Sequence, residues 1–225
     1  LLDHRGLDAF GGLVEDQEAR PAGQRAADGQ LLLLAAGEIA AAAARLVVEE
    51  GMEYAAAKRK AGRDHGRRAE LPSNEEVEDA VREHIQLFCA DTQPAELRAL
   101  REVALLWMQR LAAFRPHLAG AVWRGTATRH SAVLIDLYCD DAKAAEIALV
   151  NAGEPYDSGA VDRPGREPLN VLSVATPSRA LGETVTVHLS LHDHDDQRGA
   201  LKPDARGRSW RGDLAAVQRL LAQGP

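Results

Sequence analysis

The sequence predicts an α+β protein in which a helical region precedes a mixed β-sheet with flanking helices. Before Pro116 the apolar residues recur at the three- and four-residue spacing of amphipathic helices. After Pro116 they alternate with polar residues, as in Val185, Val187 and Leu189, which is typical of strands that bury one face. Helices first and strands second favour an α+β arrangement of layers.

Composition narrows the class of protein. The chain has 225 residues, enough for one large or two small domains, and only 4% are aromatic. A net charge of −7 argues against a nucleic-acid partner for the protein as a whole. Two cysteines, Cys89 and Cys139, do not make a disulfide scaffold. With no secretion signal among the polar first thirty residues, we expect a cytoplasmic protein, and no apolar run predicts a membrane span.

The composition changes along the chain and predicts three parts. Residues 1–37 mix glycines with charges of both signs and are expected to be a disordered tail. Residues 38–116 form the predicted helical region. Residues 117–225 form the predicted α/β core, which ends in a helix.

Each helix expected in the helical region has a start or stop signal. The first closes at Gly51, because glycine accepts the left-handed conformation that ends many helices. Ser73 and Glu76 form a capping box that opens a helix bearing Val77, Val81, Ile85 and Phe88 on its apolar face. A helix after Thr92 presents Trp107 and Met108 to the core. The expected ranges are 38–50, 52–61, 73–90 and 92–115.

The elements expected after Pro116 are shorter. Alternating or β-branched runs predict strands, and the proline- and glycine-rich residues 154–169 predict a loop. The expected strands are 121–123, 133–138, 170–175 and 184–191, and the expected helices are 140–151 and 212–221.

One motif gives a hypothesis about the family. From Gly120 to Leu137 the chain reads GAVWRGTATRHSAVLIDL. The spacing of Gly120, Arg124-Gly125 and Ser131 resembles the signature of the nucleotidyltransferase superfamily. That signature has a Gly-Ser pair, a loop of the form Arg-Gly-x-Ala-Thr-x-x-Ser, and a strand reading Asp-x-Asp. The resemblance covers about residues 95–190 and implies a nucleotidyltransferase-like sheet. The arrangement is also similar to that of small bacterial proteins of this fold with an N-terminal helical half.

The same comparison implies a degenerate active site. Members hold Mg²⁺ with carboxylates that lie two residues apart on one face of a strand. Here Ala121 replaces the signature serine, while Ala132 and Leu134 replace the two aspartates. His188 stands where a later strand would supply a third acid. The resemblance therefore implies a catalytically degenerate binding or regulatory module with no confidently assigned catalytic residue, and a magnesium cofactor only if the protein is active.

The motif loop is the expected ligand site. Backbone N–H groups, a guanidinium and hydroxyls can hold a nucleotide or another phosphate-containing ligand. The candidate nucleotide- or anion-binding residues are Gly120, Arg124, Gly125, Thr126, Thr128 and Ser131.

Two other functions remain open from the sequence. The chain could be an active magnesium-dependent nucleotidyltransferase that uses displaced carboxylates, for which the candidates are Asp136, Asp140 and Asp141. Alternatively it could be a protein-interaction module, with a protein partner bound by the helical half.

Two further clusters are weaker candidates. His192 and His194 share one side of an extended segment and could bind zinc or nickel, although such runs are mostly solvated turns. Six basic residues form either a solvated turn or a contact for phosphate, nucleotide or RNA. They are Lys58, Arg59, Lys60, Arg63, Arg67 and Arg68.

Overall fold

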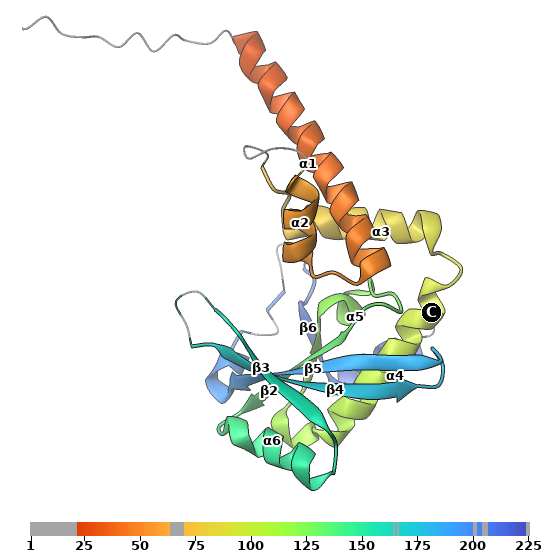
Figure 1. Cartoon of the computed structure of the whole chain (residues 1–225), viewed down its shortest axis with the longest axis vertical. Helices are drawn as coiled ribbons and strands as arrows, with labels where there is room; N and C mark the ends of the chain where they lie inside the picture. Colours follow the sequence, from red (N-terminus) through yellow and green to blue (C-terminus); the bar gives the residue numbers. More distant parts are fainter. Residues whose placement is uncertain are drawn as a thin grey trace, which may run out of the picture.

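The computed structural model describes residues 22–63, 70–163, 165, 167–199, 202–203 and 207–223. The chain begins there with three helices, α1 (Ala22–Glu50), α2 (Tyr54–Gly62) and α3 (Asn74–Phe88), which lie together on one side of the molecule (Figure 1). None of the helices in this described part carries an apolar stretch long enough to cross a membrane.

The helix signals in the sequence are confirmed, but two details were wrong. Gly51 follows α1 with φ of 66°, and the capping box between Ser73 and Glu76 is complete. However, α1 begins at Ala22, inside the segment predicted as a tail, because its many alanines and leucines favour a helix. Phe88, expected on a buried face, is 72% exposed, because α3 ends at this residue, beyond Ile85, the last buried apolar side chain of the helix.

The rest of the chain contains the sheet. Its elements are α4 (Gln93–Arg110), the 3₁₀ turn η2 (Ala112–Phe114), β1 (His117–Ala119), α5 (Gly120–Arg124), β2 (Val133–Cys139), α6 (Ala142–Asn151), β3 (Tyr156–Val161), β4 (Leu169–Ser178), β5 (Glu183–Asp193), η3 (His194–Gln197), β6 (Arg211–Asp213) and α7 (Leu214–Ala222).

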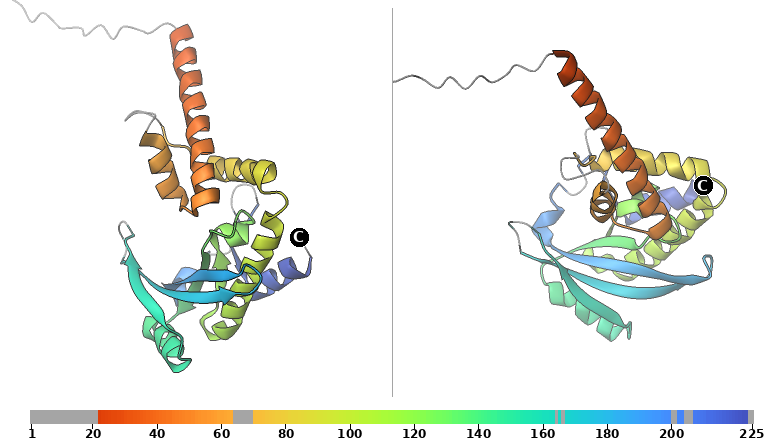
Figure 2. Two further views of the ribbon diagram at one scale, coloured as in Figure 1. Left: turned by 45° about the vertical axis from the view of Figure 1, so that its right-hand side comes forward. Right: turned by 45° about the horizontal axis from the view of Figure 1, so that its top comes forward.

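The six strands form one sheet in the order β3-β4-β5-β2-β1-β6. Strands β2 and β5 run parallel, and the other neighbours are antiparallel. Figure 2 shows α6 and the α1–α3 group on opposite sides of the sheet. The predicted α+β class, with helices ahead of a mixed sheet, is confirmed.

Two predictions for the short elements were wrong. Residues 121–123 belong to the single-turn helix α5 rather than to a strand, because Gly120 and Gly125 both take positive φ and fold the chain between them. The loop predicted for residues 154–169 contains β3, which pairs with β4 as a hairpin. Most of β3 is exposed, so burial does not impose the alternating pattern that would mark it as a strand.

The apolar side chains gather in two separate cores. One joins α1, α2 and α3 through residues such as Ile39 and Val81. The other lies between the sheet and α4, α6 and α7, and includes Leu100, Trp107 and Met108 of α4. The indole N–H of Trp107 donates to Thr176 Oγ1 at 2.7 Å, which satisfies its polar atom inside this core. Helix α4, predicted as part of the helical region, therefore packs with the sheet.

We expect Gly212→Ala to destabilise the protein by about 1–3 kcal/mol, because a Cβ at this position would lie 2.0 Å from the Trp123 ring. The free energy of unfolding in urea measures the effect. Gly159→Ala is the control, since a Cβ there meets nothing within 4 Å. Equal losses in the two variants would contradict the packing argument.

Candidate functional site

The motif loop connects two neighbouring antiparallel strands. It leaves β1 at Gly120, passes through α5 and returns along β2. Gly120 has φ of 65°, and a Cβ there would lie 2.8 Å from Leu134 Cδ1. The glycine is therefore required by both the turn and the close approach of the strand.

The sheet register brings the replaced positions together. Leu134 of β2 lies opposite His188 of the parallel strand β5. Because side chains alternate along a strand, Ala132 points to the same face as Leu134, and Asp136 follows on that face. The positions at which the resemblance implies acids thus carry an alanine, a leucine and an imidazole.

A pocket of about 160 Å³ opens beside these residues, between the helical region and the sheet. Ala121, Ala132 and Leu134 form its sheet side, and Met52 and Tyr54 lie on its helical side. Most of this wall is apolar. Its charged and polar groups come from Glu53, Glu78, Arg124 and Ser131, and the ring of Trp210 completes it.

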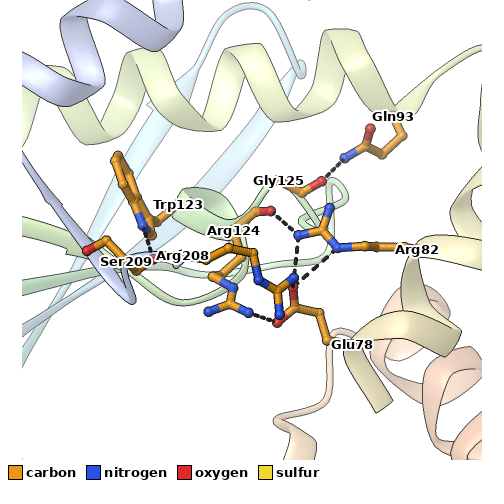
Figure 3. A network of polar contacts seen from close by, with 8 residues as sticks. All are labelled: Glu78, Arg82, Gln93, Trp123, Arg124, Gly125, Arg208 and Ser209. Carbon is orange, nitrogen blue, oxygen red and sulfur yellow. Dashed lines mark hydrogen bonds and ion pairs between the residues drawn. The ribbon is translucent and has the colours of Figure 1, made fainter. Parts of the chain in front are cut away.

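A buried carboxylate, that of Glu78, binds the arginine side chains on the charged side of the pocket. Glu78 of α3 is 1% exposed and accepts hydrogen bonds from Arg82 at 2.8 Å, from Arg208 at 3.2 Å and from Arg124 (Figure 3). We call these four residues the Glu78 network. Arg82 also donates to the backbone oxygen of Arg124 at 2.7 Å, and the Arg124 guanidinium lies 4.0 Å above the Trp210 ring.

The predicted anion-binding residues share one loop, but several polar groups of this loop already have partners in α1, in α4 or within the loop itself. Thr128 Oγ1 donates to the Val48 oxygen at 3.0 Å. The Ser131 hydroxyl accepts from the Thr128 N–H at 3.1 Å. Gln93 of α4 donates to the oxygens of Gly125 at 3.2 Å and Ala127 at 2.9 Å. Anion binding by this loop stays a prediction, and Gly120, Arg124 and Ser131 line the pocket.

Thr126, the remaining candidate, is buried next to the helical region. Burial raises the pKa of the Tyr54 phenol, which lies beside Thr126. The loop and the start of α2 are therefore in contact.

The proposed displaced carboxylates do not converge. Asp136 is buried, forms an ion pair with Arg211, and lies 3.3 Å from His192 Nε2. Asp140 has a side chain that is 90% exposed. Asp141 caps α6 by accepting from the Lys143 N–H at 2.9 Å.

Asp136 is held in its charged form by its neighbours. Burial alone would raise the pKa of this carboxyl, but hydrogen bonding to His192 and the charge of Arg211 outweigh burial and hold the pKa below its usual range. Burial of the Tyr138 phenol, and then the nearby Asp136 carboxylate, raise the pKa of Tyr138 to about 12.

The candidate metal-binding histidines face different aspartates. His192 Nε2 lies near Asp136, whereas His194 Nδ1 lies 3.9 Å from Asp140 Oδ1, at the start of η3. Within the described ranges, no three His, Cys, Asp or Glu side chains are grouped as metal ligands.

The basic cluster lies partly in α2 and partly outside the described residues. Lys58 donates to the Pro72 oxygen at 3.0 Å, and Lys60 pairs with Glu50 at 2.8 Å. Arg67 and Arg68 lie outside the described ranges. The two lysines are thus engaged with the protein itself.

No known protein family matches the sequence, and no curated protein matches it. The chain is similar to the Cid1 poly(U) polymerase bound to MgGTP, with 14% identity over 45% of this chain and 33% of that chain, at a TM-score of 0.31. It is also similar to a cytoplasmic RNA terminal U-transferase, with 15% identity over 49% of this chain and 36% of that chain, at a TM-score of 0.33.

This chain spans about a third of the length of the solved structures to which it is similar. Three features of the chain's own topology define the site: a glycine turn after β1, the motif loop, and the parallel pair β2 and β5.

Sequence reasoning missed Glu78, Arg208 and Trp210. Glu78 lies in α3 of the helical region. Arg208 and Trp210 lie between η3 and β6. No local pattern distinguishes Glu78 from a glutamate on a solvated helix face.

We expect Glu78→Gln to lower the free energy of unfolding by about 3–5 kcal/mol, because it removes the charged partner of the buried Arg124 guanidinium and of the partly buried Arg82 and Arg208. Urea unfolding at neutral pH measures this loss. Glu83→Gln, on an exposed position of the same helix, is the control and should change little. Similar stability of the two variants would show that the network does not hold the halves together.

Asp136→Asn should cost about 3 kcal/mol at pH 7, since it leaves the Arg211 charge partly buried. A carboxyl whose folded pKa is lowered stabilises the protein above its unfolded pKa of about 3.9. That contribution is lost as pH falls through the folded pKa. The difference from wild type, measured by urea unfolding, should therefore shrink below about pH 4. Asp157→Asn, on exposed β3, should show no such trend. A difference independent of pH would contradict the assigned ion pair.

Proposed function

We propose that this protein is a binding module on a nucleotidyltransferase-like fold and that it does not transfer nucleotidyl groups. The observation that carries this proposal is the presence of Ala132 and Leu134 in the wall of the pocket beside the motif loop. Neither side chain has an oxygen that could hold Mg²⁺. Asp136, the next residue on that face, is engaged with Arg211 and His192.

The shape of the pocket favours a nucleotide whose base, rather than its phosphates, makes the main contact. An apolar cavity of about 150 Å³ accommodates a benzene ring, and this pocket has a volume of about 160 Å³. Trp210, Tyr54 and Met52 offer ring faces and a thioether to a ring-sized group. The phosphates would then lie at the pocket mouth, where magnesium contributes little to affinity.

The first experiment tests for catalysis. The purified chain is incubated with labelled nucleoside triphosphates, Mg²⁺ or Mn²⁺, and cell extract as acceptor. We expect no transfer above background, because catalysis of this reaction depends on metal-held charge neutralisation. Label transfer that disappears in Asp136→Asn would instead support the enzyme with displaced carboxylates.

The second experiment tests binding. ATP, GTP and UTP, and the corresponding nucleosides, are titrated with and without Mg²⁺. We expect weak binding that is independent of Mg²⁺ and at least about tenfold weaker in Ala132→Phe, which fills the pocket without removing a polar contact. Ala175→Phe, on an exposed position of β4, is the control. Binding that requires Mg²⁺, or that survives Ala132→Phe, would contradict the proposed site.

A further inference from the structure

A second pocket lies at the carboxyl end of the parallel strands β2 and β5. Its volume is about 520 Å³. Tyr138 and His192 form part of its floor, and residues from η3, β6 and the β3–β4 connection complete its sides. The carboxyl ends of parallel strands are where open α/β sheets commonly bind ligands. This pocket is lined by a different set of residues from the one beside the motif loop.

The floor of this second pocket is fixed by buried contacts. The His192 ring stacks on Tyr138 with ring centroids 5.3 Å apart, and its Nε2 faces Asp136 at 3.3 Å. Asp136 also pairs with Arg211, whose side chain is 31% exposed. The imidazole and the Arg211 guanidinium are therefore held by the protein itself, which leaves the charges of the rim to contact a ligand.

The charges around the rim have both signs. Arg163 lies 3.8 Å from Asp196, so these two charges largely compensate each other. Arg198 and Asp195 also line the pocket, and within the described residues neither side chain forms an ion pair. Arg198 contributes a positive charge and Asp195 a negative charge. Among the described residues, these two charges are paired neither with each other nor with Asp136 or Arg211 of the floor.

This charge pattern disfavours ligands of a single sign. A simple anion attracted by Arg198 would approach Asp195 and Asp196, and a simple cation attracted by the aspartates would approach Arg198 and Arg211. A ligand that carries both charges satisfies both sets. Guanidinium groups pair well with carboxylates, in geometries that can include two parallel hydrogen bonds, and aspartates accept from ammonium groups.

We propose that this second pocket binds a small zwitterion of the amino-acid class. Its carboxylate contacts Arg198, and its ammonium group contacts Asp195 and Asp196. The assignment does not depend on the proposed nucleotide site, because the two pockets share no lining residue.

The test uses the full chain and isothermal titration calorimetry. Each standard amino acid is titrated first. The strongest binder is then compared with its N-acetyl derivative, which lacks the cation, and with its amide, which lacks the anion. We expect each derivative to bind about tenfold or more weakly, because it loses one charge-assisted contact.

Matched variants locate the binding. Arg198→Gln and Asp195→Asn should each weaken amino-acid binding about tenfold, with no change in nucleotide binding or thermal stability, since both residues are exposed. Lys143→Gln, an exposed residue of α6 that lines another surface hollow, should bind like wild type.

Three results of the calorimetry on the wild-type protein would overturn the proposal. They are the absence of binding by every amino acid, an N-acetyl derivative that binds as well as the free amino acid, and an amide that does so. The second result would identify an anion site, and the third a cation site. Amino-acid binding that is unchanged in both charge variants would place the ligand elsewhere.

Discussion

The buried carboxylate of Glu78 connects the two halves of this protein. The helical region and the sheet have separate apolar cores, so the hydrophobic effect stabilises each half but does little to fix one against the other. Glu78 projects from α3 and accepts hydrogen bonds from arginines of its own helix, of α5 and of the segment before β6. A buried charge is costly unless it is paired and hydrogen-bonded, so this network requires the halves to adopt one arrangement.

The same network changes the meaning of the motif loop. In the sequence, Arg124, Thr128 and Ser131 resemble residues that contact phosphates. In the structure, Arg124 faces Glu78, and Thr128 binds the backbone at the end of α1. The loop therefore contacts α1 and α3 of the helical region through these two residues. The pocket that remains between the loop and the helices is mainly apolar.

Asp136 shows how one strand can serve two neighbouring pockets. Leu134 and Asp136 lie on one face of β2, but the leucine borders the pocket at the motif loop and the aspartate supports the floor of the second pocket. The carboxylate is held by hydrogen bonding to His192 and by the Arg211 charge, against the effect of burial. It thus acts on this face as an orienting group for an imidazole and a guanidinium.

The sequence by itself determined that helices precede the strands of the sheet, and it determined the capping box at Ser73, because both depend on residues close together in the chain. The expectation that Ala132 and Leu134 stand at positions of acids also came from the sequence, through the resemblance of the motif, and it stays a prediction. Only the tertiary structure decided the partners of Glu78 and Asp136, because Arg208 and Arg211 are far away along the chain. It also decided that α4 packs with the sheet, since an amphipathic helix shows which face is apolar but not which core will cover it.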